Sequence, residues 1–200
     1  VTFTHGEGVW LWDDQNNRYL DAISGIAVCN LGHCHPAVTQ AICQQAGQLV
    51  HTSNLYQIER QEVLGDVLIE ASGMDKVFFC NSGTEANEAA IKLARLYGHK
   101  KGIELPTIIV MENSFHGRTM AALTATGNEK IKEGFGPMLE GFLRVPYNDI
   151  NAVEQAFASN PNIVAVLVEP VQGEGGVLPA DPTWCQRLRD LCQTHDALMM

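Results

Sequence analysis

The chain has 200 residues, of which 46% are apolar and 18% are charged, and its formal net charge is −10. This balance is typical of a folded globular protein and argues against a disordered chain. A strongly acidic protein repels phosphate backbones, so a nucleic-acid partner is not expected. No apolar run approaches the roughly 18 residues that a membrane-spanning helix needs, so we expect no membrane segment. No targeting signal is visible in the first residues, and a cytoplasmic location is the default prediction.

The N-terminal part of the chain predicts a β-hairpin followed by two helices. Mostly apolar and aromatic runs at 9–12 and 19–22 flank a polar turn, which is the pattern of two antiparallel strands. Pro36 fits the first position of a helix with a stripe of apolar residues. Residues 57–71 predict a second amphipathic helix. Residues 1–50 differ in texture from the rest of the chain and are assigned to a small N-terminal segment.

From residue 76 onward, short continuous apolar runs alternate with helical patterns. The expected strands cover residues 77–80, 107–111, 142–145, 163–168 and 197–200. Ser82, Asp149 and Asp181 each precede a helical pattern and can cap it. Apolar strands separated by helices predict an α/β fold, with a mostly parallel sheet covered by helices on both faces. We assign residues 51–200 to the first part of a large domain.

The first candidate site follows the expected strand at 77–80. Ser82 and Glu85 match the capping box that marks a helix start. Gly83 allows close approach of a ligand to the backbone, and Thr84 adds a hydroxyl group. Free N–H groups and the helix dipole favour a phosphate at such a position. An ordinary cap needs no ligand, so the turn alone is consistent with either a phosphate site or a simple helix start.

Two further strands end in polar loops that contain glycine. After the strand at 107–111, Phe115 could stack on a planar ligand and Arg118 could hold a carboxylate. After the strand at 163–168, Glu169 and Glu174 lie in a glycine-rich loop and could neutralise an arginine or carry acid–base chemistry. A core phenylalanine, a surface arginine and a solvated turn are the simpler alternatives for each loop. Because ligands bind at the carboxyl ends of parallel strands, three such loops favour a ligand site there.

Metal binding is not predicted from this sequence. The six cysteines form no C-x-x-C pair and are typical of free thiols in a reducing compartment. His33, Cys34 and His35 are adjacent, and adjacent residues rarely chelate one ion together. A zinc hydrolase built on His33, His35 and His116 therefore has little support from spacing.

Taken together, the three loops resemble one family, the class III aminotransferases, which are pyridoxal-phosphate enzymes of fold type I. The matching segments are Asn81–Glu88, Ser114–Thr119 and Glu169–Gly176, with agreement also at Gly25–Val28, Leu31–Pro36 and Phe135–Pro137. The resemblance covers almost the whole chain in the family's order. It implies the fold type I architecture, with residues 51–200 as the start of the cofactor-binding domain.

The resemblance also implies a role for each candidate residue. Ser82, Gly83 and Thr84 would bind the phosphate of pyridoxal 5′-phosphate, and Phe115 would pack on its pyridine ring. Arg118 would hold the α-carboxylate of the amino-acid substrate.

The acidic residues of the motifs receive their roles from the same resemblance. Glu174 would be the carboxylate that pairs with a mobile arginine, so that one pocket serves two substrates. Glu169 and Glu85 would lie just outside the site.

Within the family, the segments His51–Tyr56 and Gly25–Val28 are most similar to the acetylornithine branch. This likeness implies a transaminase that moves the amino group of N-acetylornithine to 2-oxoglutarate in arginine biosynthesis, with Asn54 at the acyl end of the pocket. Succinylornithine, ornithine and 4-aminobutyrate are the alternative donors. The family likeness also implies a homodimer with active sites at the interface.

Transamination needs a lysine amine for the Schiff base and an acidic residue at the pyridine nitrogen. No lysine of the chain matches the family position, so no catalytic residue is assigned within 1–200. The resemblance places the aspartate just after the strand that starts at Ala197, and the lysine further on. We therefore expect a truncated chain. The alternative for the 200 residues as they stand is a phosphate-binding fragment without catalytic activity.

Overall fold

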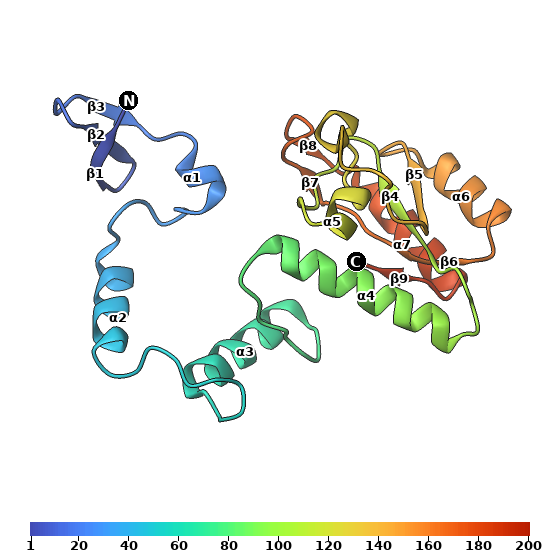
Figure 1. The fold of residues 1–200 in the computed structure, drawn as a ribbon, viewed down its shortest axis with the longest axis horizontal. Coiled ribbons are helices and arrows are strands. Elements are labelled where there is room, and N and C mark those ends of the chain that lie inside the picture. Colours follow the sequence, from blue (N-terminus) through green and yellow to red (C-terminus); the bar gives the residue numbers. More distant parts are fainter. The chain divides into compact units, whose positions relative to one another are not determined.

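The computed structural model describes all 200 residues, which form two compact units, residues 1–77 and residues 78–200 (Figure 1). The break between them falls after residue 77, later than residue 50, where the pattern of apolar and polar residues changes. The assignment of residues 1–50 and 51–200 to two different domains therefore stays a prediction. No helix is both long and apolar enough to cross a membrane.

The first unit begins with a three-stranded antiparallel sheet. Its strands are β1 (Phe3–Glu7), β2 (Trp10–Asp13) and β3 (Arg18–Leu20), in chain order. The predicted hairpin is confirmed, because β2 pairs antiparallel with β3. The Asp13 carboxylate closes the turn between them by accepting hydrogen bonds from Gln15 N, Asn17 N and the Tyr19 hydroxyl. The sequence did not predict the strand β1, which pairs with β2 at one edge of the sheet.

Helices complete the first unit. They are α1 (Ser24–Ala27), α2 (Pro36–Ala46) and α3 (Glu59–Ser72). Pro36 occupies the start of α2, as predicted, and Gly73 ends α3 with a left-handed φ of 68°. No side chain of these three helices is buried, so they form no buried apolar core within this unit.

The second unit, green to red in Figure 1, contains a four-stranded parallel sheet in the order β5-β4-β6-β9. Its strands are β4 (Thr107–Met111), β5 (Phe142–Val145), β6 (Ile163–Val166) and β9 (Leu198–Met199). All four lie where the sequence predicts strands. A two-stranded antiparallel pair, β7 (Val171–Gln172) and β8 (Leu178–Pro179), follows β6.

Helices cover both faces of this sheet, and side chains of β4 alternate between the two resulting cores. The helices are α4 (Gly83–Lys100), α5 (Met120–Ala125), α6 (Ile150–Ser159) and α7 (Pro182–Thr194), with a short 3₁₀ helix at Glu129–Lys132. Ile108 and Val110 pack with α4 and α5. Ile109 and Met111 pack with α6 and α7. Each such side chain contributes about 1.5–3 kcal/mol by burial. The predicted α/β fold is therefore confirmed.

Three predicted helix caps form as expected. The side chains of Ser82, Asp149 and Asp181 accept hydrogen bonds from the N–H groups of Glu85, Ala152 and Trp184, respectively. Each satisfies an amide that has no acceptor inside its helix. Local sequence is sufficient to place these helix starts.

The predicted strand at 77–80 does not form in this chain. Residues 77–80 have no backbone pairing, and the Phe78 side chain is 71% exposed. A β-strand exists only with a neighbour to which it donates and accepts hydrogen bonds. The apolar pattern is that of a segment that can join a sheet, but none of the strands in these 200 residues pairs with it.

Candidate functional site

The second and third candidate loops meet at the carboxyl edge of the parallel sheet. The strands β4 and β6 are neighbours, so the loops that follow them leave the sheet side by side. Phe115 N donates a hydrogen bond of 2.9 Å to the Glu169 carboxylate, and Gln172 Nε2 donates one of 2.8 Å to the Glu112 carbonyl oxygen. These cross-loop bonds confirm the convergence that the parallel sheet implies.

The first candidate turn lies at the N-terminus of α4. Ser82 Oγ accepts from Glu85 N at 3.2 Å, and the Glu85 carboxylate accepts from Asn81 N at 2.5 Å. The capping box therefore forms, with its return bond made to Asn81 rather than to Ser82. The N–H groups of Gly83 and Thr84 have no acceptor in the chain, and no atom lies within 4 Å of a Cβ placed on Gly83. This end of the helix can accept an anion.

The turn at α4 contacts the loop after β4. A Cβ placed on Gly117 would lie 2.8 Å from Thr84 Cγ2 and closer still to Thr84 Oγ1. The φ of Gly117 is 128°, a conformation that side chains disfavour. Asn87 Nδ2 also donates a hydrogen bond of 2.7 Å to the His116 carbonyl oxygen. All three candidate segments are thus joined by direct contacts, and glycine is required at position 117.

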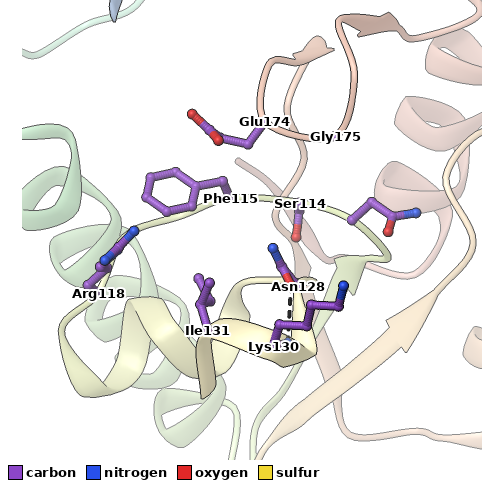
Figure 2. Close-up of a pocket in the computed structure, with 9 residues that line it drawn as sticks. Ser114, Phe115, Arg118, Asn128, Lys130, Ile131, Glu174 and Gly175 are labelled. Carbon is purple, nitrogen blue, oxygen red and sulfur yellow. Dashed lines mark hydrogen bonds between the residues drawn. The ribbon is translucent and has the colours of Figure 1, made fainter. Parts of the chain in front are cut away.

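A cavity of about 290 Å³ opens between the second and third loops. Its lining residues are Asn113, Ser114, Phe115, Arg118, Asn128, Lys130, Ile131, Glu174 and Gly175. Figure 2 shows the Phe115 ring between the Glu174 and Arg118 side chains. Arg118 and Glu174 are exposed and take part in no ion pair within the chain. One cationic, one aromatic and one anionic side chain therefore remain available to a ligand in this cavity.

Two ionisable groups next to the cavity-lining residue Phe115 have shifted pKa values. Burial lowers the pKa of His116 to about 4, and the nearby Arg144 charge acts in the same direction. This imidazole is 4% exposed and neutral near pH 7. Burial raises the pKa of Glu169, while the hydrogen bond from Phe115 N opposes that shift. Neither group lines the cavity, and Glu169 holds the loop in place through its hydrogen bond with Phe115 N.

The predicted site residues fall into three places. Phe115, Arg118 and Glu174 line one cavity. The turn Ser82–Thr84 does not line it but touches the same loop through Thr84. Asn54 lies in the first unit, where its side chain is exposed. The ligand roles of all these residues stay predictions.

Some lining residues escaped the sequence analysis. Asn128, Lys130 and Ile131 belong to the segment of the 3₁₀ helix, and Asn128 caps that helix by accepting from Lys130 N at 3.1 Å. A polar segment without a regular pattern carries little signal, and only the capping asparagine marks it. The structure groups no three His, Cys, Asp or Glu side chains that could hold a metal ion.

The chain belongs to the class III aminotransferases, because the model of the family "Aminotransferase class-III" matches residues 1–200. Among curated proteins, the acetylornithine aminotransferase of Nitrosomonas europaea is 63% identical over 200 residues, which are 100% of this chain and 51% of that protein. The acetylornithine aminotransferase of Halalkalibacterium halodurans is 52% identical over 100% of this chain and 50% of that protein. The chain thus spans about half the length of the curated relatives it matches.

Solved structures agree with the family and confirm the fold. The ornithine aminotransferase from Toxoplasma gondii ME49 matches with a TM-score of 0.94 at 34% identity, over 100% of this chain and 48% of that one. The N-acetylornithine aminotransferase from Stenotrophomonas maltophilia K279a matches with a TM-score of 0.84 at 39% identity, over 100% of this chain and 49% of that one. The predicted fold type I architecture is therefore confirmed.

Proposed function

We propose that the whole protein carrying these residues is a pyridoxal-phosphate-dependent transaminase that moves the amino group of N-acetylornithine to 2-oxoglutarate. One observation carries this proposal. The start of α4, which can accept an anion, contacts the loop that holds the Phe115 ring and the unpaired Arg118. The choice of donor rests on the similarity to acetylornithine aminotransferases, which reaches 63% identity. The reaction is a step of arginine biosynthesis.

The residues present fit pyridoxal 5′-phosphate. Its phosphate needs N–H donors without other acceptors, and Gly83 and Thr84 supply two at the positive end of α4. Its ring needs a flat apolar neighbour, and the half-buried Phe115 ring faces an open cavity. When bound, the cofactor supplies the electron sink that transamination requires. These residues hold and orient the cofactor, and none of them transfers a proton.

Arg118 is the group that we assign to the substrate carboxylate. Its planar guanidinium can form two parallel hydrogen bonds with a carboxylate, and no side chain of this chain competes for it. The α-carboxylate is common to the amino donor and the 2-oxo acid, so one arginine serves both half-reactions.

Glu174 lines the same cavity as Arg118 and carries the opposite charge. A free carboxylate there repels the second carboxylate of 2-oxoglutarate unless a cation neutralises it. We assign Glu174 to pairing with an arginine that lies outside these 200 residues, and we assign Asn54 to the acyl end of the donor.

The Schiff-base lysine and the acidic partner of the pyridine nitrogen are also assigned to the part of the protein outside residues 1–200. A homodimer and a cytoplasmic location are part of the same proposal. The similarity to family members of about twice this length supports the assignment of the lysine and the acidic residue to that part.

The test is to measure transamination by the purified full-length protein. N-acetylornithine should change the visible absorption of the bound cofactor and should yield glutamate from 2-oxoglutarate. Succinylornithine, ornithine and 4-aminobutyrate serve as competing donors, and a preference for one of them would correct the donor. No spectral change with any amino donor would refute the transaminase assignment.

A further inference from the structure

Arg118 lies in a loop that α4 holds on both sides. On one side, Asn87 Nδ2 donates a hydrogen bond of 2.7 Å to the His116 carbonyl oxygen. On the other side, the Thr119 hydroxyl donates to a carboxylate oxygen of Glu88. The His116 backbone before the arginine and the Thr119 side chain after it are thus tied to two consecutive residues of one helix.

Glu88 also determines where the next helix begins. The same carboxylate oxygen accepts a hydrogen bond of 3.2 Å from Ala122 N, in the first turn of α5. Amides in the first turn have no acceptor inside their helix, and Thr119, the N-cap of α5, supplies no side-chain cap. A carboxylate at this end is also favoured by the helix dipole. Glu88 therefore fixes both the residue at which the loop of Arg118 ends and the position of the first turn of α5, which follows it.

The phosphate turn lies on the same face of α4. Thr84, Asn87 and Glu88 are spaced i, i+3 and i+4, which places their side chains together on one side of the helix. Thr84 packs against Gly117, the residue directly before Arg118. At 1.5 Å of rise per residue, Glu88 lies about 6 Å along the helix from Thr84. A rigid helix rather than a flexible loop therefore sets the separation of the anion site from the arginine.

We propose that Asn87 and Glu88 are positioning residues that hold Arg118 at a fixed distance from the phosphate turn. This inference rests on the proposed function of Arg118 and of that turn. Neither side chain lines the cavity that Arg118 faces. A guanidinium binds a carboxylate through directional paired hydrogen bonds, so a small displacement of the loop weakens that contact. The phosphate turn uses N–H groups at the start of the helix, and it does not depend on either side chain.

The experiment compares single variants of the full-length holoenzyme. Glu88→Ala and Asn87→Ala should each raise KM for N-acetylornithine and for 2-oxoglutarate about tenfold, with kcat changed much less. Calorimetry with glutarate, a dicarboxylate that cannot react, should show the same loss of affinity. The dissociation constant of the cofactor, followed by absorbance, should change by less than about twofold because the phosphate donors remain.

Two controls separate positioning from general damage. Glu88→Gln keeps an oxygen that accepts from Thr119 and Ala122, so it should restore most of the lost affinity. Glu104→Ala removes an exposed carboxylate that makes no hydrogen bond or ion pair, so it should behave as the parent enzyme. If Glu88→Ala does not fold, Asn87→Ala carries the test, and Glu88→Gln remains the conservative control.

The outcomes decide the inference and the function separately. Unchanged KM values and unchanged glutarate affinity in an active enzyme would overturn the positioning role. A parallel loss of cofactor and glutarate affinity would also overturn it, because it would indicate a merely structural role. A parent enzyme that transaminates no donor, but whose glutarate affinity falls in the variants, would refute the proposed function and support the positioning.

Discussion

Replacing Gly117 by alanine should be costly, because two independent effects act at this position. The new Cβ would lie 2.8 Å from Thr84 Cγ2, closer than real Cβ atoms approach, and the contact lies between α4 and the loop after β4. Overpacking of this kind costs about 1–3 kcal/mol. The φ of 128° adds about 1–3 kcal/mol for a residue with a side chain. We expect the free energy of unfolding to fall by about 4 kcal/mol in total, which is the sum of the midpoints of the two ranges.

Urea denaturation of the full-length protein measures this change, and two further variants divide it. Gly134→Ala introduces a side chain at a φ of 81° with no atom within 4 Å, so it should lose only about 1–2 kcal/mol, the backbone part. Thr84→Ala on top of Gly117→Ala removes the two nearest atoms and should recover about 1–2 kcal/mol. Equal losses for the alanine variants of Gly117 and Gly134 would refute the claim that contact with Thr84 requires the glycine.

Three other changes probe the caps, the arginine and the buried histidine. Ser82→Ala removes the acceptor for Glu85 N and should cost about 1 kcal/mol in urea denaturation, with weaker cofactor binding by absorbance; unchanged stability would contradict the cap. Arg118→Lys keeps the charge but not the fork, so KM for both substrates should rise about tenfold, and a rise for only one would contradict a shared role. The pKa of His116 is lowered to about 4 in the folded protein, so the unfolded chain takes up the histidine proton at a higher pH than the folded one does. The free energy of unfolding therefore falls as the pH is lowered from 6.5 to 4. Between pH 6.5 and 4, the parent protein should lose about 3 kcal/mol more of its free energy of unfolding than the His116→Asn variant does. Urea denaturation at several pH values measures both, and equal pH profiles would contradict the prediction.

Similarity of fold and similarity of sequence carry different information about this chain. The backbone matches an ornithine aminotransferase with a TM-score of 0.94, higher than the 0.84 for an N-acetylornithine aminotransferase. The identities run the other way, at 34% and 39%. A shared backbone supports many substrates, since specificity lies in the side chains of the site. The proposed donor therefore depends on sequence similarity and on the assay, rather than on the fold.

Local patterns were sufficient to predict most elements of the second unit. The strand at 107–111 and the helix starts after Asp149 and Asp181 are set by short-range features, namely a continuous apolar run or a side chain that caps its own helix. The motifs likewise identified Phe115, Arg118 and Glu174 as one group, and the structure places all three around one cavity. Grouping their loops at one edge of the sheet needed only the rule that parallel strands end at the same edge, whereas their ligand roles come from the family resemblance and stay predictions.

Contacts between distant segments could not be predicted in this way. The apolar run at 77–80 reads as a strand, yet no neighbour pairs with it in this chain. The residues Asn87 and Glu88 are ordinary polar positions of a helix until the fold brings residues 116–122 against them. Pairing and hydrogen bonding across a sheet depend on which segments become neighbours, and that is decided by the packing of the whole unit. The sequence by itself determined the family, most of the elements and three of the residues around the cavity, because these follow from short-range patterns and motifs. The tertiary structure decided which strands find a partner, which helix face contacts the loop of Arg118 and which cavity that arginine lines, because these depend on contacts between distant segments.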